Sequence, residues 1–404
     1  MRDAKTHSDR PRVLFTAFEP SGDDHASSVI RELRRRYPEI EVFAWGGPKM
    51  ARAGATIVQQ TGEDAVVGIP KWDTIKKYRK IQSDITAWIR ANGPAVHVPV
   101  DSPAANFHIC KQARRHGAKV VHLVAPQLWA WGPWRINKLR KRTDLVLCIL
   151  PFEERWFNVR KVPARFVGHP LFDEPLDLDA LTDTARMLPE GRPRVAILPG
   201  SRPAELRRNF PLFLQAFREL KQRHPGMVGV VGATTEQVRA QLYERANALG
   251  GWPEGMDVRV GETDLVARWS DLAIVVSGTV TLQLAKQAKP MVIVYKTNKI
   301  FYNLIGRWVI STKLLSLPNL IAGKQIVPEL IPYFSGTERL VDEVDRLIKD
   351  AAAQERQRKA LRALTARFDG KIASAEAADA IAEMAGLEHR AHAAVAPKQI
   401  ADQD

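Results

Sequence analysis

The chain has 404 residues, of which 45% are hydrophobic and 26% are charged. This composition is that of a globular protein, and the length favours two domains over one. The formal net charge of +15 favours anionic partners, which include nucleic acid, acidic lipid head groups and phosphorylated substrates.

Other features of the sequence exclude several classes of protein. Cys110 and Cys148 show neither metal-site nor disulfide spacing, so we expect a reducing compartment. The polar N-terminus lacks the apolar segment of a signal peptide, and no apolar run is long enough to cross a bilayer. The histidines lack zinc-ligand spacing, and no nucleic-acid-binding module fits. A cytoplasmic protein, soluble or peripheral to a membrane, is therefore expected.

Short β-branched runs alternate with amphipathic helical stretches along most of the chain. Their apolar residues are continuous, which is typical of parallel strands buried on both faces. The pattern predicts an α/β protein with two facing, Rossmann-like, doubly wound parallel sheets. In chain order the expected strands are VLFTAF, EVFAWGG, AVHVPV, KVVHLVA, LVLCIL and ARFVGH, followed by RVAILPG, MVGVVGA, DVRVG, LAIVVSG and PMVIVY.

An acidic, turn-rich stretch between Pro170 and Gly191 separates these two groups of strands. Beyond about Leu340 the composition is rich in Ala, Arg and Leu and predicts helices, and the last residues are polar and predict disorder. The expected organisation is a disordered N-terminus (1–11), a first domain (12–172), a linker (173–192), a second domain (193–345), C-terminal helices (346–387) and a disordered tail (388–404).

Ligands of such sheets bind off the carboxyl ends of the strands. In the second domain, ILPGSRPAEL runs from a strand through Gly200, Ser201 and Arg202 into a helix. Backbone N–H groups and the helix dipole bind anions at such a start, and Arg202 would add a clamp on a phosphate. The alternative is an ordinary capped turn, which is favoured if this turn is considered alone.

A second turn of the same kind, VVSGTVTLQL, strengthens the ligand interpretation. Ser277, Gly278 and Thr279 supply N–H and hydroxyl donors, and Gln283 lies about one helical turn further along, within reach of a ribose. Two anion-binding turns in one domain suggest a diphosphate, as in a nucleotide sugar.

In the first domain, FEPSGDDHASSVI crosses from a strand to a helix. This turn either caps the helix or holds a sugar hydroxyl through Glu19, Ser21, Gly22 and Asp23. His25, in the same stretch, is expected to be structural or exposed, whereas a histidine beside the domain break, in ARFVGHP, is better placed for function.

Two further motifs fit two interpretations each. VPVDSPAANF ends a strand with Asp101, which is placed either as a general base or as a helix N-cap. In SLPNLIAGKQIVPEL, Asn319 either contacts a nucleobase edge or belongs to a segment packed on a helix, and the composition favours packing.

Three tryptophans lie close together in VAPQLWAWGPWRINKLRKRTD. We expect Trp129 and Trp131 at the wall of the cleft between the domains or in the core beneath it. Trp134 and the basic run that follows are expected at the rim, because an indole beside cations suits a membrane interface. Burial of all three rings is the alternative.

Nine short motifs occur in the order SGD, EDAVVGI, DSP, APQLWAW, LPFE, FVGHP, LPGSR, SGT and LPNLIAG. With them the sequence resembles the lipid-A-disaccharide synthase family from about Val13 to Leu330. The resemblance implies an inverting glycosyltransferase of the two-domain GT-B type that needs no metal or other cofactor. It implies transfer of diacylglucosamine from UDP-2,3-diacylglucosamine to lipid X, which gives a β-1,6-linked lipid A disaccharide 1-phosphate and UDP.

The resemblance also implies roles for the two domains and for single residues. The first domain is then the acceptor side and the second binds the UDP-sugar. Asp101 and Arg202 are the expected catalytic residues. The other donor-binding residues are Gly200, Ser201, Ser277, Gly278, Thr279, Gln283 and Asn319. The acceptor-side residues are Glu19, Ser21, Gly22, Asp23, Asn106, Trp129 and Trp131. Other expected partners are an anionic membrane surface at the inner face of the inner membrane and no nucleic acid, with a homodimer left open.

Three departures from the family pattern leave alternatives open. Gln283 stands where the family usually has a glutamate, Ala104 replaces an acidic residue, and the glycine that commonly follows the SGD turn is missing. The alternatives are a related GT-B enzyme that acts on another UDP-sugar, such as a peptidoglycan-type transferase or an epimerase, and a degenerate relative that binds anionic lipid or nucleic acid without catalysis.

Overall fold

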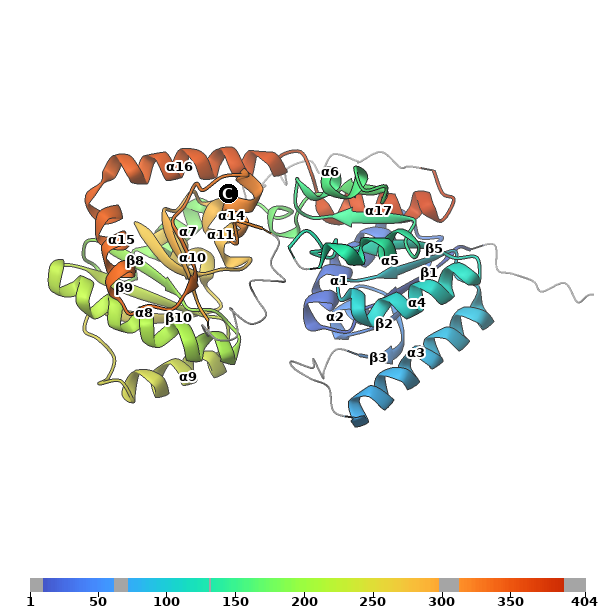
Figure 1. Cartoon of the computed structure of the whole chain (residues 1–404), viewed down its shortest axis with the longest axis horizontal. Coiled ribbons are helices and arrows are strands. Elements are labelled where there is room, and N and C mark those ends of the chain that lie inside the picture. Colours follow the sequence, from blue (N-terminus) through green and yellow to red (C-terminus); the bar gives the residue numbers. More distant parts are fainter. Residues whose placement is uncertain (1–9, 62–71, 131, 298–311, 389–404) are drawn as a thin grey trace, which may run out of the picture.

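The computed structural model describes residues 10–61, 72–130, 132–297 and 312–388. They form two parallel β-sheets flanked by helices, which lie side by side in Figure 1. We name them the first lobe, built on strands β1–β7, and the second lobe, built on β8–β13. The expected class, two doubly wound parallel α/β sheets, is confirmed. Within the described ranges, no helix combines the length and apolar character that crossing a membrane requires. Most of the two segments expected to be disordered lies outside those ranges.

The first lobe has a seven-stranded sheet in the order β3-β2-β1-β4-β5-β6-β7. Its central strands are buried on both faces, which explains their continuous apolar sequences. The elements are β1 (Arg12–Thr16), α1 (Pro20–Arg36), β2 (Glu41–Gly46), α2 (Pro48–Arg52), β3 (Thr56–Gln60), α3 (Trp72–Asn92), β4 (Val96–Pro99), α4 (Pro103–Arg115), β5 (Lys119–Leu123), η1 (Pro133–Arg135), α5 (Ile136–Arg140), β6 (Leu145–Cys148), α6 (Glu153–Asn158) and β7 (Ala164–Phe166).

The second lobe has a six-stranded sheet in the order β10-β9-β8-β11-β12-β13. The connection from the first lobe contains η2 (Pro170–Phe172) and α7 (Leu178–Ala185), and α7 packs against α10 of the second lobe. The further elements are β8 (Arg194–Leu198), α8 (Pro203–Arg223), β9 (Val228–Ala233), α9 (Glu236–Asn247), β10 (Met256–Val260), α10 (Thr263–Trp269), β11 (Leu272–Val276), α11 (Val280–Lys286), β12 (Met291–Lys296), α14 (Leu317–Ala322) and β13 (Glu329–Tyr333).

Two strands were not expected from the sequence, and both lie at a sheet edge. β3 has the sequence TIVQQ, with four exposed residues and one half-buried residue, so it lacks the apolar run that marks a central strand. β13 has the sequence ELIPY and contains Pro332, which an edge strand tolerates because one of its sides needs no ladder hydrogen bond. β13 and α14 overlap the segment 316–330, and α14 packs on α11, in agreement with the packing that the composition favoured.

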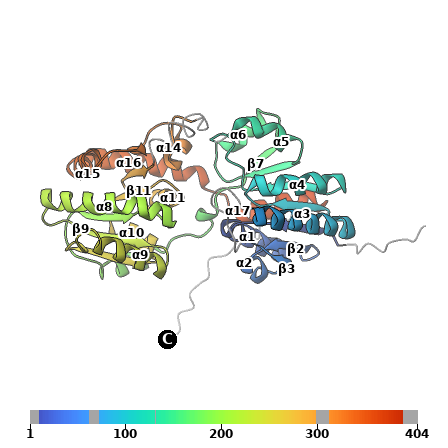
Figure 2. The ribbon, with the colours of Figure 1, turned by 60° about the horizontal axis from the view of Figure 1, so that its bottom comes forward.

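The C-terminal helices connect the two lobes. α15 (Glu338–Lys349) packs on α8, and α16 (Ala351–Thr365) packs on α11 and α14 of the second lobe. After η4 (Ala366–Phe368), the chain returns to the first lobe, where α17 (Ala373–Met384) packs on α1 (Figures 1 and 2). The first lobe is therefore built from both ends of the described chain.

A buried polar contact fixes α17 on α1. A guanidinium nitrogen of Arg36 lies 2.9 Å from Asp379 Oδ2, and both side chains are at most 5% exposed. The hydroxyl of Tyr37 donates to the other oxygen of the same carboxylate at 2.7 Å. Asp173 accepts hydrogen bonds from the backbone N–H groups of Ala373 and Ser374, which begin α17. Polar side chains therefore hold both the start of α17 and its face toward α1.

We predict that Asp379→Ala strongly destabilises the first lobe. The substitution removes the carboxylate that faces the buried Arg36 guanidinium, and loss of one partner of a buried ion pair costs about 3 kcal/mol or more. The matched control on the same helix is Glu383→Ala, which removes the half-exposed pair with Arg165 and should cost less than about 1 kcal/mol. Urea unfolding followed by tryptophan fluorescence measures both, and equal losses would contradict the prediction.

Candidate active site

The order of the strands reverses at one place in each sheet. In the first lobe β1 and β4 are neighbours, although β2 and β3 lie between them in the chain. In the second lobe β8 and β11 are neighbours in the same way. Crossover helices leave on opposite faces at such a reversal, so the carboxyl ends of the two strands border a crevice where ligands bind. The predicted turns follow these four strands.

Asp101 and Ser102 connect β4 to α4 through an unfavourable backbone conformation. Their φ angles are +47° and +26°, values that side-chain-bearing residues rarely adopt. The N–H of Asp101 donates to Leu123 O at 3.0 Å, and the Ser102 hydroxyl donates to a carboxylate oxygen of Glu19. The turn after β4 is thereby joined to the turn after β1.

The Asp101 carboxyl lies in an environment that favours its protonated form. Burial raises its pKa, as does the charge of Glu19, while a backbone hydrogen bond at Ser102 and the charge of His25 act in the opposite direction. A pKa raised above the usual aspartate range suits a group that accepts a proton near neutral pH. Glu19 is exposed and Asp101 is half-buried, so the two carboxyl groups differ in their access to solvent.

His25 is the residue of this group that the sequence did not indicate as functional. Burial lowers the pKa of this half-buried imidazole, and the charges of Asp101 and Asp24 raise it. His169, which precedes η2, has its pKa lowered to about 4 by burial and by the charge of His25. The spacing from Ser21 to His25, four positions on one helix, is the signal that places His25 on the same face.

Two of the predicted acceptor-side residues have their polar atoms occupied within the protein. The Asp23 carboxylate accepts hydrogen bonds from the N–H groups of Gly47, Lys49 and Met50, and so caps α2. Asn106 is fully buried, and its amide donates to the carbonyl oxygens of the turn that carries Asp101. Both residues therefore hold the backbone around the site through hydrogen bonds within the protein.

The other two acceptor-side residues of the first turn differ in exposure. Ser21 is exposed. Gly22 is buried, and a Cβ atom at this position would lie 3.1 Å from the Cβ of Ala17. The glycine thus permits close approach of α1 to the end of β1, while Ser21 is available to a ligand.

In the second lobe, the turn from β8 into α8 requires glycine at its first position. Gly200 has a φ of +104°, and a Cβ atom there would lie 2.6 Å from Glu205 Oε2. Glu205 accepts hydrogen bonds from the backbone N–H of Arg202 at 3.4 Å and from its guanidinium at 3.1 Å. Ser201 is exposed, and the Arg202 side chain is 80% exposed. The start of this 21-residue helix is thus open to an anion, with a cation beside it.

The turn from β11 into α11 lies next to it, because β11 pairs with β8. Ser277 donates from its hydroxyl to Leu315 O at 3.4 Å, and the hydroxyl of Thr281 donates to Gly278 O at 2.7 Å. Thr279 is exposed. Gln283 is half-buried. The structure places these predicted donor residues at the carboxyl end of β11, beside Gly200 and Arg202 at the carboxyl end of β8.

Asn319 lies at the back of this edge, fully buried in α14. Its amide nitrogen donates to Val327 O and to Glu329 Oε2, and its oxygen accepts from the N–H groups of Ile326 and Val327. Because its donors and acceptor are engaged in this way, Asn319 stabilises the segment between α14 and β13.

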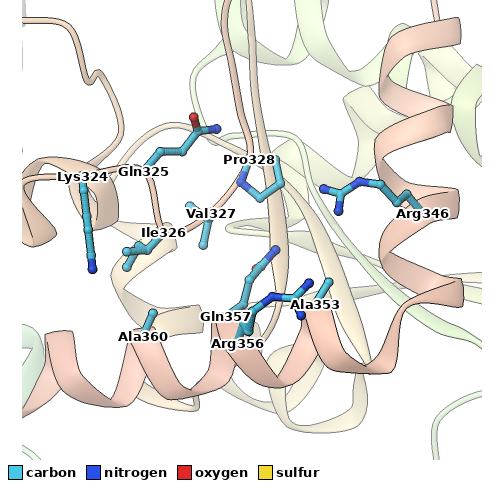
Figure 3. Close-up of a pocket in the computed structure, with 10 residues that line it drawn as sticks. All are labelled: Lys324, Gln325, Ile326, Val327, Pro328, Arg346, Ala353, Arg356, Gln357 and Ala360. Atoms are coloured by element: carbon cyan, nitrogen blue, oxygen red, sulfur yellow. The ribbon is translucent and has the colours of Figure 1, made fainter.

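A cavity of about 460 Å³ opens beside that segment, between it and helices α15 and α16. Figure 3 shows Lys324 and Arg346 on opposite sides of the cavity and Arg356 and Gln357 side by side on the helix below it. No residue predicted for the active site lines it.

The tryptophan segment divides between the interior and the surface. Trp129 is buried, its ring packs edge-on against Phe152 with centroids 5.0 Å apart, and its N–H donates to Glu153 Oε1 at 3.0 Å. Trp134 is 67% exposed. Trp131 and the EDAVVGI motif lie outside the described residues. Trp129 thus belongs to the core rather than to a surface that contacts a ligand.

The comparisons with known proteins agree with this arrangement. The profile of the lipid-A-disaccharide synthetase family matches residues 13–383. The chain belongs to this family. The lipid-A-disaccharide synthase of Anaeromyxobacter dehalogenans, for example, is 35% identical over 363 residues, which cover 88% of this chain and 92% of that relative. The chain is accordingly a glycosyltransferase of lipid A biosynthesis, as the sequence predicted.

Two solved structures share the fold. The S. aureus MnaA–UDP co-structure has a TM-score of 0.62 at 11% identity and covers 94% of this chain and 98% of that one. Acinetobacter baumannii MurG has a TM-score of 0.57 at 15% identity and covers 92% and 99%. At these identities the likeness concerns the fold, and it identifies the two-lobed GT-B architecture within the lipid-A-disaccharide synthetase family.

Glu153 beneath Trp129 gives a testable dependence of stability on pH. Burial raises the pKa of its carboxyl group from the ordinary 4.5 to about 7. Between these values the folded protein retains a proton that the unfolded chain has released, so stability falls as pH rises from about 4.5 to 7. We predict that, in Glu153→Gln, the free energy of unfolding falls by about 2 to 3 kcal/mol less over this pH range than in wild type.

Urea unfolding at pH 4.5, 6 and 8 measures this difference between wild type and variant. Glu154→Gln is the matched control, because it removes the adjacent half-buried carboxylate and keeps Glu153. If wild type and Glu153→Gln lose the same stability between pH 4.5 and 8, Glu153 does not titrate in this range.

Proposed function

We propose that this glycosyltransferase moves diacylglucosamine from UDP-2,3-diacylglucosamine to lipid X with inversion at the anomeric carbon. The acceptor hydroxyl attacks C1 of the donor sugar, the bond from C1 to the UDP oxygen breaks, and UDP leaves with the electron pair. The products are the β-1,6-linked lipid A disaccharide 1-phosphate and UDP. The membership in the lipid-A-disaccharide synthetase family supports this choice of reaction.

Asp101 is the proposed general base, and its position is the observation on which the proposal rests. It follows β4 at the strand-order reversal of the first lobe, and its carboxyl has a raised pKa. In the reaction it takes the proton of the acceptor hydroxyl as the new C–O bond forms. Glu19 and Ser21, on the neighbouring turn, are proposed to orient the acceptor sugar.

The leaving UDP is proposed to bind at the reversal of the second lobe. The N-terminus of α8, with Gly200 and Ser201, offers backbone N–H groups to the diphosphate, and Arg202 adds a positive charge where negative charge develops. The exposed Thr279 supplies a further hydroxyl donor and Ser277 supplies its backbone N–H, because the Ser277 hydroxyl donates to Leu315 O. Gln283 is proposed to reach the ribose. Amide oxygen accepts a ribose hydroxyl as a carboxylate does, although without its charge.

Three predicted residues receive positioning roles in this proposal. Asn106 and Asp23 fix the turns after β4 and β1, and Asn319 fixes the segment after α14, because their polar groups bond to the protein itself. The buried Trp129 donates to Glu153, which also accepts from the backbone N–H of Leu150, so it holds the start of α6.

We propose peripheral binding to an anionic membrane through the region of α5, which would deliver the lipid substrates. Trp134 is 67% exposed, and the cations that follow it, Lys138, Arg140 and Lys141, are exposed as well. An indole at the head-group level together with basic side chains near anionic lipids contributes to such binding. The net charge of +15 agrees with this partner.

The direct test mixes the purified protein with UDP-2,3-diacylglucosamine and lipid X in detergent and follows UDP and the tetraacyl disaccharide phosphate by mass spectrometry. We expect both products from wild type. Asp101→Asn should reduce turnover by about 100-fold or more, because general base catalysis contributes that much, while UDP affinity measured by calorimetry stays unchanged. In wild type, kcat/KM should fall with decreasing pH already above the ordinary aspartate range, since the pKa of Asp101 is raised.

Two results would contradict this function. UDP binding without disaccharide formation would indicate another sugar or acceptor. Loss of UDP binding in Asp101→Asn would indicate that Asp101 is structural rather than the base.

Arg202 provides a separate prediction about the donor site. Arg202→Ala should weaken UDP binding by about 10- to 100-fold, because a charge-assisted hydrogen bond to a phosphate is worth about 1.5–3 kcal/mol. Arg223→Ala is the matched control, an exposed arginine at the other end of the same helix. Titration calorimetry with UDP measures both, and an unchanged affinity in Arg202→Ala would remove Arg202 from the phosphate site.

A further inference from the structure

Three buried polar side chains lie beneath the Asp101–Ser102 turn, on a mostly apolar face of the first sheet that also carries the buried His122 of β5. Thr16 ends β1, His97 lies in β4, and Asn106 lies in α4. All three are completely buried. The residues around them on this face include Leu14, Ile85 and Ile109. Buried polar groups in an apolar layer cost free energy unless they bond to one another.

Strand register explains why the three meet. His97 is the partner of Leu14 across the β1–β4 ladder, and Thr16 lies two residues beyond Leu14. The side chains of Leu14, Thr16 and His97 therefore point to the same face of the sheet. α4 follows β4 directly and covers this face, which brings Asn106 above Thr16. The proposed reaction does not use Thr16 or His97.

The hydrogen bonds form one continuous chain toward the turn. His97 Nε2 lies 2.9 Å from Thr16 Oγ1, and Thr16 Oγ1 donates to Asn106 Oδ1 at 2.6 Å. Asn106 Nδ2 then donates to Val100 O at 3.4 Å and to Ser102 O at 3.3 Å. These two carbonyl groups flank Asp101 on both sides.

The direction of every proton in this chain is determined. Asn106 must present its nitrogen to two carbonyl oxygens, so its oxygen faces Thr16. Thr16 has one hydroxyl proton and gives it to that oxygen, so its own oxygen accepts the Nε2–H of His97. Burial and the neighbouring His122 lower the pKa of His97 to about 3, so the ring is neutral. The tautomer with its proton on Nε2 is the one that matches the Thr16 acceptor. Its other nitrogen, Nδ1, has no hydrogen-bond partner among the described residues.

The turn needs such support because its conformation is unfavourable. Two adjacent residues with side chains hold positive φ angles, +47° at Asp101 and +26° at Ser102. Conformations of this kind persist only where the surroundings impose them. The backbone N–H groups of Ala105 and Asn106 donate to Ser102 O as part of the first turn of α4. The side-chain amide of Asn106 bonds to the carbonyl groups on both sides of Asp101.

We propose that Thr16 and His97 are positioning residues of the reaction, which act through Asn106 to hold the turn that aims the Asp101 carboxylate at the acceptor hydroxyl. This inference rests on the proposed role of Asp101 as the base. Removing the Thr16 hydroxyl leaves Asn106 Oδ1 buried without its hydrogen-bond donor, so the amide is no longer held against the carbonyl groups of Val100 and Ser102. The turn then relaxes from the conformation that the reaction requires, while the second lobe, which binds UDP, is unaffected.

The test compares Thr16→Val, Thr16→Ser and the double variant Thr16→Val/His97→Phe. Valine has the shape of threonine without the hydroxyl, and serine keeps the hydroxyl. We expect Thr16→Val to lower kcat by about 10- to 100-fold, the cost of a small misplacement of a catalytic group, with KM for the UDP-sugar unchanged. Thr16→Ser should retain most of kcat.

The double variant separates positioning from stability. In Thr16→Val, the Nε2–H of His97 is left buried without its acceptor, which lowers the melting temperature. Replacing His97 as well removes that unpaired donor and restores part of the lost stability, while Asn106 Oδ1 still lacks its donor. We therefore expect the double variant to regain melting temperature but not kcat. The matched control is Thr143→Val, which removes a buried threonine hydroxyl that donates to Leu139 O at 2.7 Å, far along the chain from Asp101.

Hydrogen exchange of the segment 100–107 gives a readout that does not depend on catalysis. The amides of Ala105 and Asn106, which donate to Ser102 O, should exchange faster in Thr16→Val and in the double variant than in wild type, Thr16→Ser or Thr143→Val. Unchanged exchange would overturn the proposal, as would faster exchange with unchanged kcat, an equal loss of kcat in Thr143→Val, or recovery of kcat in the double variant. Absence of disaccharide with wild type would instead refute the proposed function, and the exchange experiment would still decide whether the chain of hydrogen bonds holds the turn.

Discussion

The reversal of strand order in each sheet determines where chemistry can take place in this molecule. Parallel strands are joined by crossovers of one hand, so helices cover opposite faces on the two sides of a reversal and leave the strand ends between them uncovered. β1 and β4 meet in this way in the first lobe, and β8 and β11 in the second. Side chains that are distant in the sequence, such as Glu19 and Ser102, thereby come within hydrogen-bonding distance.

Carboxylates hold turns in both lobes, since Glu19 accepts a hydrogen bond from Ser102 in the first, but the group beneath the proposed base is neutral, which suits its charge. In the second lobe, carboxylates hold the turns: Glu205 caps α8, and Glu329 accepts from the backbone of Leu315 and Ser316. In the first lobe, a neutral chain of His, Thr and Asn lies beneath Asp101. A further carboxylate there would oppose the ionisation of Asp101, which a base requires. Neutral donors impose the geometry without that electrostatic cost.

The sequence predicted the fold class because its signal lies in the central strands. Residues 13–15 and 272–276 are apolar throughout, since both faces of these strands are covered. β3 and β13 were not predicted because edge strands are partly exposed and their sequences contain polar residues or proline. In the segment after Ser316, the partners of Asn319 decide the structure, and they lie seven to ten positions further along.

The candidate site was predictable in position but only partly in role. A strand followed by Gly–Ser–Arg or Asp–Ser–Pro predicts a turn at the carboxyl end of that strand, and the structure has both turns there. Whether a polar residue faces a ligand or the protein depends on contacts across the fold. Asn106 bonds to Thr16, 90 positions away, and the local motif contains no trace of that contact. His25 was not predicted for the same reason, because its relation to Asp101 arises only when β1 and β4 pair.

The return of α17 to the first lobe has a consequence for the order in which the protein is made. A chain synthesised from its N-terminus generally folds domain by domain as each becomes complete. Here the second sheet is complete once Tyr333 has emerged, whereas the core of the first lobe still lacks Ala377, Ala378 and Ile381 of α17. The lobe that begins the sequence is therefore the last to be finished, and until then the surface of α1 that receives α17 stays open to water.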